Sequence, residues 1–204
     1  MRSIVIIILV FTINLAGWGQ DFRKYFGVAI DFNKPIVNKE FISSLSKKGY
    51  KVVYREFIND RLSIGGEAAL ASYNGYIPPA VYTQDDLTFI YTDIYAYVYS
   101  YSLAFSGEYF FSTKNIVMPY SGVGLGVAYN QFTMFYNVYK QQDNRWGALV
   151  RPHGGAILRF SKKSNWGIMA DVHLDYATTK SEDTDYDKGF ATVGFQAGLV
   201  FIRQ

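Results

Sequence analysis

The chain has 204 residues, of which 50% are apolar, 18% aromatic and 18% charged, with a formal net charge of +3. This length suits a single domain, and the charged fraction lies below the ~25% usual for soluble domains. The absence of cysteine excludes a disulfide framework, thiolate chemistry and a cysteine-ligated metal site. The small net charge, and the lack of a basic run interleaved with aromatic residues, argue against nucleic acid as a partner.

Residues 1–19 have the pattern of a cleaved secretory signal peptide. Arg2 supplies the positive charge, residues 4–13 form an apolar core, and Gly17-Trp18-Gly19 form a small-x-small cleavage site. The alternative is a transmembrane anchor, but the apolar core is shorter than the ~20 residues that a spanning helix needs. We therefore expect an exported protein whose barrel domain covers residues 20–204.

Period-two alternation of side chains predicts eight β-strands. The longest example is residues 91–111, where tyrosine, leucine and phenylalanine fill the odd positions and, from Ser100, small or polar residues fill the even ones. The solvent face of a soluble strand does not carry so long an aromatic stripe, so we expect lipid to cover it. The strands are expected over residues 22–32, 50–58, 61–73, 91–111, 116–130, 146–160, 166–176 and 189–202.

The connections between these strands alternate in length. A short amphipathic helical turn, capped by Asn38, is compatible with residues 39–47 of the first loop. Short turns at one end and long loops at the other, with an even strand number and periplasmic termini, are typical of bacterial outer-membrane barrels. The sequence therefore predicts an all-β fold, an eight-stranded antiparallel up-and-down transmembrane β-barrel. Tight turns are expected at 59–60, 112–115 and 161–165, and long loops at 33–49, 74–88, 131–145 and 178–188.

The outward face of the predicted barrel is apolar, and aromatic residues are expected to form girdles at both ends of the lipid-facing wall. At the outer ends of their strands we expect Trp146 and Tyr176, and at the inner ends Phe160 and Trp166 among others. The residues assigned to the lipid-facing wall and its girdles are Tyr99, Tyr101, Leu103, Phe105, Phe111, Leu125, Trp146, Trp166, Leu174 and Phe201.

The inward face collects charged residues, with Gly122, Gly124 and Gly126 making room for them. Pairing Phe160 with Trp166 across their turn sets Arg151 opposite Asp175 and His153 opposite His173. Because an eight-stranded barrel has so narrow an interior, buried charges there must pair. We interpret them as a polar network that sets the register and closes the pore: Asp31, Glu67, Glu108, Arg151, His153, Arg159, Asp171, His173 and Asp175.

Two chemical roles are alternatives for these residues. Histidine with a carboxylate and a serine would make a hydrolytic set, but no hydroxyl residue lies two positions after His153 and no serine flanks His173, and both histidines point into the lumen. His153, His173, Asp171 and Asp175 have the ligand types of a metal site but no spacing motif. The acidic loop 182–187 lacks the spaced oxygen pattern of a calcium loop. We expect no catalytic residue, no metal and no cofactor.

The chain resembles the small outer-membrane β-barrel proteins. The features that carry this resemblance are the signal ending near Gly19-Gln20, the eight alternating strands, Gly-x-Gly-x-Gly at 122–126 and the closing Gly198-Leu-Val-Phe201. The glutamine after the cleavage site and the tyrosine-rich strands look most like the porin-family barrels of Bacteroidota. The resemblance implies a location in the outer membrane of a Gram-negative bacterium and says little about the role.

Three functions are compatible with this sequence. The first is a non-enzymatic integral outer-membrane barrel with a structural, surface-binding or narrow-pore role, in contact with membrane lipid and with a protein or surface partner through its outer loops. The second is a soluble, exported, lipocalin-like carrier, which would need the inverse alternation, apolar inside and polar outside. The third is a lipid-A-modifying enzyme. The alternation favours the first.

Overall fold

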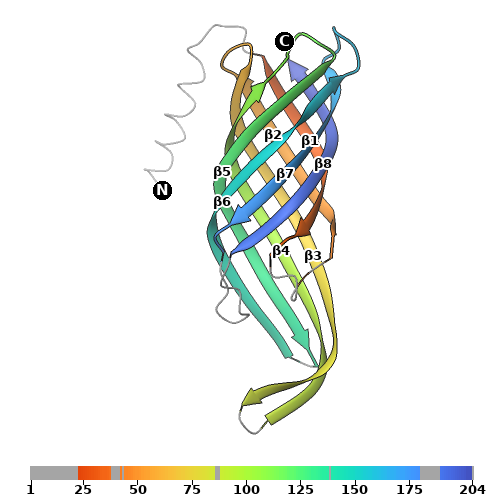
Figure 1. Cartoon of the computed structure of the whole chain (residues 1–204), viewed down its shortest axis with the longest axis vertical. Coiled ribbons are helices and arrows are strands. Elements are labelled where there is room, and N and C mark those ends of the chain that lie inside the picture. The colour runs from red at the N-terminus through yellow and green to blue at the C-terminus, as the bar shows by residue number, and fades with distance from the viewer. Residues whose placement is uncertain are drawn as a thin grey trace, which may run out of the picture.

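The computed structural model describes residues 23–37, 42, 44–85, 88–137, 139–179 and 189–203, and of these it describes the backbone alone for residues 82–85 and 88–90. Each strand pairs antiparallel with the next, and β8 pairs with β1, so that the sheet closes into a barrel (Figure 1). The predicted fold class, all-β with eight antiparallel strands in a closed ring, is confirmed. The strands are β1 (Lys24–Pro35), β2 (Ser46–Phe57), β3 (Leu62–Asp85), β4 (Thr88–Phe110), β5 (Val117–Tyr136), β6 (Tyr139–Arg159), β7 (Trp166–Ala177) and β8 (Phe190–Arg203).

In β1 the side chains alternate between the outer wall and the barrel interior. Phe26, Val28 and Ile30 are exposed on the outer wall, whereas Ala29 and Asp31 are buried inside. Successive Cβ atoms of a strand point to opposite faces, so one run of sequence supplies both the wall and the filling of the barrel. In the described part of the chain, no helix is long and apolar enough to span a membrane.

The short turns lie at the same end of the barrel as the start of β1 and the end of β8 (Figure 1). The β2–β3 turn is held by Asn59, whose side-chain oxygen accepts hydrogen bonds from the backbone N–H groups of Arg61 at 2.9 Å and Leu62 at 2.8 Å. An asparagine side chain that replaces a backbone acceptor is a common way to stabilise a tight reversal. We call this end the inner rim and the opposite end the outer rim.

The two middle loops expected at the outer rim are wrong, because both segments are strand. The β3–β4 register continues through Asn74↔Tyr97 and Tyr76↔Tyr95 to the end of the hairpin. The β5–β6 register likewise continues to Tyr136↔Tyr139. The intervening turn contains Asn137, whose φ of 53° lies in the left-handed region that asparagine tolerates. Phe132 and Thr133 are still buried, but the rest of these two segments lies beyond the barrel interior, so their sequence lacks the alternation between a lumen face and a lipid face.

Pro78 and Pro79 favoured a loop in the sequence but lie within β3, where the register with β4 shifts between Ile77 and Ala80. Proline is tolerated in a sheet at an edge strand and at a bulge, and β3 is an edge at this point. Its pairing with β2 ends at Tyr50↔Leu70.

Four strands therefore continue beyond the ring as part of the same sheet. We call this part the extension: β3 from residue 71 to residue 85, β4 from 88 to 99, β5 from 131 to 136 and β6 from 139 to 147. The β6–β7 register stops at Leu149↔Ala177, whereas β6 remains paired with β5 to its first residue. The β3–β4 hairpin projects furthest and bends (Figure 1).

The helical turn expected over residues 39–47 is wrong where it can be tested, because Ser46 and Lys47 belong to β2. Residues 38–41 and 43 lie outside the described residues, as do the signal segment and the acidic loop 180–188. At the start of β2 the pairing with β1 changes from Asp31↔Gly49 to Asn33↔Ser46. One residue of β1 thus faces two of β2, which is a β-bulge.

Candidate functional site

The interior of the barrel is filled in layers, and the first, at the inner rim, is apolar. Its residues come from seven of the eight strands and have relative exposures of 5% or less. Aromatic rings interlock within it, with Phe57 and Phe110 centred 4.9 Å apart and Phe110 and Tyr120 5.2 Å apart. This layer closes the inner end of the lumen: Tyr25, Val53, Phe57, Phe110, Met118, Tyr120, Ile157, Met169, Val200 and Ile202.

The second layer is a chain of charged side chains that crosses the lumen. Arg55 donates to Glu108 through Nε at 3.0 Å and to Glu67 through Nη2 at 2.6 Å. Arg151 donates to Glu67 through Nη1 at 2.9 Å and forms a bidentate pair with Asp175, with both N–O distances at 2.6 Å. Both guanidinium groups are almost fully buried. The chain joins β2, β3, β4, β6 and β7 and so holds their register.

Hydroxyl groups satisfy remaining acceptors of this chain. Glu108 accepts hydrogen bonds from the hydroxyls of Tyr25 and Ser63, and Glu67 accepts one from Ser106 at 3.4 Å. A buried ion pair is favourable only when additional hydrogen bonds satisfy its other lone pairs. These contacts therefore explain how so narrow an interior holds full charges.

His153 ends the charged chain. It faces His173 in the β6–β7 register, as the pairing of Phe160 with Trp166 predicted. Its Nδ1 lies 3.2 Å from the carbonyl oxygen of Arg151, and its Nε2 lies 3.3 Å from Glu108 Oε1. Both ring nitrogens thus lie against acceptors, and neither contacts a hydroxyl in the described part of the chain.

His173 belongs to a second polar cluster. Its Nε2 lies 2.9 Å from the side-chain oxygen of Asn33, and the ring stands between Asp31 at 3.4 Å and Asp171 at 3.6 Å. Asp171 also accepts a hydrogen bond from Tyr120 at 2.8 Å. A hydrolytic site requires a nucleophile within hydrogen-bond reach of the imidazole, and neither histidine has one among the described residues. Those residues also contain no cluster of three or more groups able to hold a metal ion.

The glycines of β5 leave the space that the charged layer occupies. A Cβ on Gly122 would lie 2.8 Å from His153 Nε2 and 2.5 Å from the Gly107 carbonyl oxygen, and one on Gly124 would lie 3.3 Å from a Glu67 oxygen. Both distances to Gly122 are shorter than real Cβ contacts allow. Gly122 therefore faces the charged side chains, as the sequence predicts.

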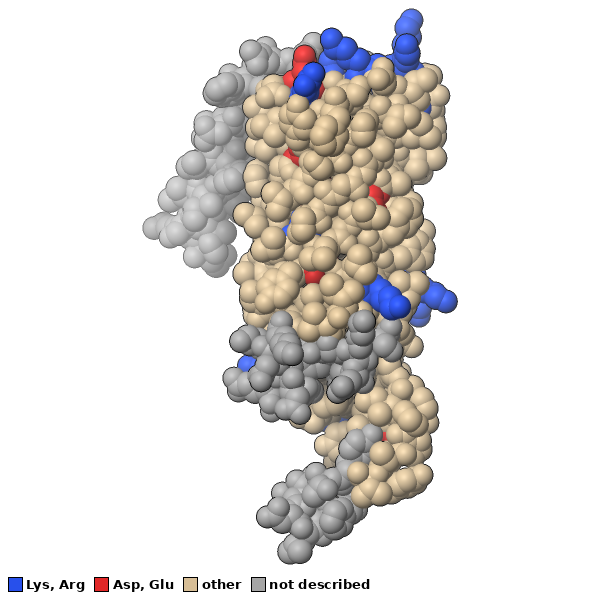
Figure 2. Space-filling model, in the orientation of Figure 1, with Lys and Arg blue, Asp and Glu red and all other residues tan. Residues whose placement is uncertain are grey.

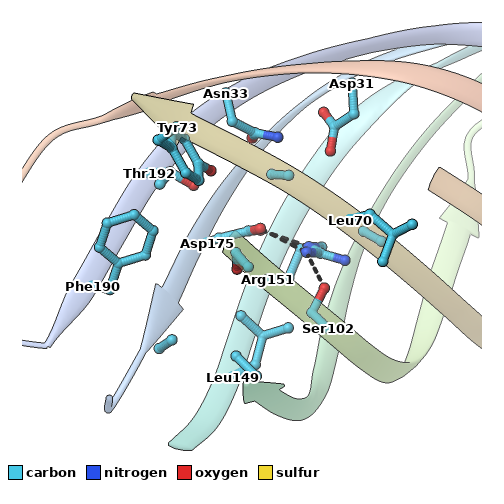
Figure 3. A pocket seen from close by; sticks show the side chains of 15 residues that line it. Asp31, Asn33, Leu70, Tyr73, Ser102, Leu149, Arg151, Asp175, Phe190 and Thr192 are labelled. Carbon is cyan, nitrogen blue, oxygen red and sulfur yellow. Dashed lines mark hydrogen bonds and ion pairs between the residues drawn. The ribbon is translucent and has the colours of Figure 1, made fainter. Parts of the chain in front are cut away.

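Above the charged layer, the lumen holds a cavity of about 20 Å³ beside Arg151 and Asp175 (Figure 3). The Arg151 guanidinium also donates to Ser102 at 3.0 Å on one side of this cavity. A volume of this size accommodates about one water molecule. It is capped toward the outer rim by a second apolar layer: Ile42, Tyr73, Ala96, Val98, Phe132 and Phe190.

The nine residues expected in the lumen all face inward, but they do not form one network. Arg159 lies at the inner rim, where it donates to the backbone carbonyls of Lys162 and Ser164 in the β6–β7 turn. The sequence reasoning missed Arg55 and Lys51, which are 0% and 2% exposed. Period-two alternation through β2 would have placed both with Phe57 on the inward face.

The ten residues expected on the lipid-facing wall are all exposed, from 37% for Tyr99 to 72% for Trp146. Trp146 does not lie at the end of its strand, because β6 continues seven residues further to Tyr139. It lies instead near the level at which β7 stops. Figure 2 shows that lysine and arginine gather at the two ends of the barrel and that the visible wall between them is nearly free of charge.

No protein-family model matches the chain, and no curated protein matches it. Solved structures do. Neisserial surface protein A is 15% identical, with 89% of this chain and 97% of that chain covered and a TM-score of 0.50. Ail, the attachment invasion locus protein of Yersinia pestis, solved with the heparin analogue sucrose octasulfate, is 14% identical, with 90% and 99% covered and a TM-score of 0.48.

The N-terminal β-barrel domain of Pseudomonas aeruginosa OprF is 16% identical, with 90% of this chain and 100% of that chain covered and a TM-score of 0.42. At these identities the likeness concerns the fold alone, and the argument rests on Neisserial surface protein A. The chain has the fold of an eight-stranded outer-membrane β-barrel. Membership of the porin-family barrels of Bacteroidota stays a prediction.

Proposed function

We propose that the protein is an integral barrel of the bacterial outer membrane, delivered through its signal peptide and with both termini in the periplasm. The observation that carries this proposal is the outer wall, which exposes large apolar side chains on all eight strands while the charges are buried inside. Closure of the ring pairs the backbone of every strand on both sides, as a lipid environment requires. A soluble carrier would have the opposite alternation.

Tryptophan fluorescence tests the membrane location. The chain from Gln20 onward contains two tryptophans, Trp146 and Trp166. The variants Trp146→Phe and Trp166→Phe each leave one reporter after refolding into phosphatidylcholine vesicles. Lipids brominated near the headgroup should quench both reporters strongly, because aromatic girdles lie at the interface. Absence of quenching in protein that has retained heat-modifiable migration would refute the proposal and favour the soluble carrier.

We further propose that the barrel does not conduct. The three layers and the water-sized cavity support this role, since side chains of the described residues fill the lumen at each of these levels. Planar bilayers with the refolded protein should show no steady conductance above the bare membrane. Arg55→Ala/Arg151→Ala removes the two guanidiniums that cross the lumen but leaves both apolar layers, so it should remain closed as well. Steps of ion current from the unaltered protein would refute a closed lumen.

We propose that the extension binds a partner protein. An extended segment of that partner pairs with the edge of β6 by strand addition. Ala148 donates its N–H to Thr178 and accepts a hydrogen bond from the Thr178 N–H, so its polar backbone groups face β7. Alternate residues of a strand point the same way, so Lys140 and Gln142 present their backbone groups on this side, beyond the end of β7. The opposite edge, on β3, is interrupted by prolines, which block strand addition.

Selection of a phage-displayed peptide library on the refolded barrel tests this role. Gln142→Pro removes one edge N–H, while Gln142→Ala keeps it and serves as the matched control. Peptides selected on the unaltered protein should bind the alanine variant equally and lose roughly tenfold or more with the proline variant, since one missing backbone hydrogen bond and a blocked edge act together. Equal binding to both variants, or no selectable peptide, would contradict strand addition.

We propose no catalytic role. The burial of His153 and His173 inside the barrel supports this, because a lipid-modifying enzyme must present its site to the membrane. Cells that carry His153→Ala or His173→Ala should have the same outer-membrane lipid profile as cells with the unaltered protein. A loss of any lipid species in either strain would restore the enzymatic hypothesis.

A further inference from the structure

The β-bulge at the start of β2 points two lysines outward together. Phe32 of β1 faces both Lys47 and Lys48, because the flanking pairs are Asp31↔Gly49 and Asn33↔Ser46. In a regular strand, neighbouring side chains would alternate between the lumen and the wall. Here Ser46 and Gly49 are buried, and both lysines between them are exposed. Bulges often re-aim side chains in this way at functional positions.

The two lysines line a depression on the outside of the wall, together with Ser72, Asn74 and the tyrosines Tyr97 and Tyr99. A second depression lies on the other side of the same tyrosines. It contains Lys140, whose ammonium lies 5.9 Å from the centre of the Phe135 ring. The two depressions therefore form one band of lysine ammonium groups, hydroxyls and amides around a pair of tyrosines.

This band lies just beyond the apolar wall. The residues that precede it on adjacent strands are Tyr50, Leu70 and Tyr101, which lie side by side in the register and are 60%, 48% and 45% exposed. Lys48 is two residues from Tyr50, so at about 3.3 Å per residue it lies within roughly 7 Å of the apolar wall. Lipid headgroups occupy this depth, next to the aromatic girdle.

The charge of the band selects an anion. The exposed charged side chains around the depressions are the three lysines Lys47, Lys48 and Lys140. Along β4 the first acidic residue outward from Tyr97 is Asp93, four residues further from the wall. An ammonium group is a common phosphate binder, and hydroxyl and amide donors complete such a site.

We propose that this band binds the phosphate groups of a phosphorylated glycolipid in the outer leaflet, with Lys47 and Lys48 as the principal contacts. The inference rests on the proposed membrane location and adds a specific lipid class to it. The phosphate is attached to lipid, because the depressions adjoin the wall on the face that lipid covers. By binding these phosphates, the lysines set how deeply the barrel sits in the outer leaflet. The lysines and arginines of the inner rim lie at the other end of the barrel.

Binding of lipid A with and without its phosphates tests this site. The refolded barrel is placed in phosphatidylcholine vesicles that contain labelled diphosphoryl or dephosphorylated lipid A. The variant Lys47→Gln/Lys48→Gln removes both cations, and Lys162→Gln/Lys163→Gln removes an adjacent exposed pair from the inner-rim turn as a matched control. Each lysine near an anionic membrane surface contributes about a fivefold factor, so the first variant, which removes two, should bind diphosphoryl lipid A roughly 25-fold more weakly.

The unaltered protein and the inner-rim variant should bind diphosphoryl lipid A alike, and dephosphorylated lipid A should not distinguish any of the three proteins. Unchanged binding by the Lys47→Gln/Lys48→Gln variant would overturn the site while leaving the membrane location intact. Equally tight binding of free inorganic phosphate and of diphosphoryl lipid A would assign the lysines to a free anion and overturn the lipid. Failure of the unaltered protein to insert into vesicles would overturn the membrane location itself.

Discussion

Removal of Arg151 is the most direct test of the charged layer. Its guanidinium donates to Asp175 twice, to Glu67 and to Ser102, and its side chain is 2% exposed. Arg151→Met keeps much of the volume and leaves Asp175 without its bidentate partner, whereas Glu67 keeps Arg55. Removing one partner of a buried pair typically costs 3–5 kcal/mol. Because the Asp175 side chain is 17% exposed, we expect a loss of unfolding free energy of about 3 kcal/mol, near the lower limit.

The same reasoning predicts that a second substitution restores stability. Arg151→Met/Asp175→Leu removes both charges of the pair, and replacing a buried pair with apolar residues is often close to neutral. We expect the double variant to lose about 1 kcal/mol relative to the unaltered protein, less than either single variant, with a coupling energy of about 2 kcal/mol or more in the double-mutant cycle. Guanidinium unfolding in phosphatidylcholine vesicles measures all four proteins.

The exposed pair Lys24–Glu56 provides the control, with an N–O distance of 3.1 Å and side chains 38% and 32% exposed. Lys24→Met should change stability by no more than about 0.5 kcal/mol, because solvent screens exposed pairs. Additive losses for Arg151→Met and Asp175→Leu, or an Arg151→Met loss as small as that of Lys24→Met, would refute the claim that the charged layer sets stability.

Three further substitutions probe packing and turn geometry, each followed by guanidinium unfolding in vesicles. Gly122→Ala should lower the free energy of unfolding by about 1–3 kcal/mol, because its Cβ would press on His153 and on the neighbouring backbone. Gly66→Ala, whose nearest neighbour is 3.9 Å away, should be nearly neutral. Equal effects of the two substitutions would contradict this packing. Asn137→Ala should cost about 1 kcal/mol at its φ of 53°, and Asn137→Gly should not. Tyr25→Phe removes a hydroxyl donor from the charged layer and should cost about 1–2 kcal/mol; an unchanged midpoint would show that this hydrogen bond is dispensable.

Sequence alone predicts the ring well because lipid-facing and lumen-facing demands differ so strongly within each strand. Around the β6–β7 turn, Phe160 and Trp166 must both face outward, and this single constraint brings His153 opposite His173. Where both faces of a sheet meet the same medium, the period-two signal disappears. Residues 74–88 and 131–145 of the extension were therefore predicted as loops, and Pro78-Pro79 reinforced that prediction, whereas the part of β4 from residue 91 was predicted as strand.

The filling of the lumen was only half predictable. Charges stand out on an inward face, but the inner-rim layer places Phe57, Phe110 and Tyr120 inside as well. An apolar residue at an inward position resembles one at an outward position, so the sequence does not show that the barrel is sealed by aromatic packing. The pairing of Arg151 with Asp175 follows from the predicted register, but Arg55 was missed, because it bridges Glu67 and Glu108 across strands whose separation only the closed ring defines.

The unequal lengths of the strands support the proposed role of the extension. A tilted strand crosses a membrane with about 9–11 residues, and β7 has 12, whereas β3 has 24 and β4 has 23. The excess does not enlarge the lumen, which is already closed by its layers. The additional residues form the extension on one side of the barrel. There β3 no longer pairs with β2, and β6 no longer pairs with β7, within a few residues of Lys47 and Lys48. A barrel that only stabilised the membrane would need neither feature. The proposed strand addition and the proposed lipid site both use these features.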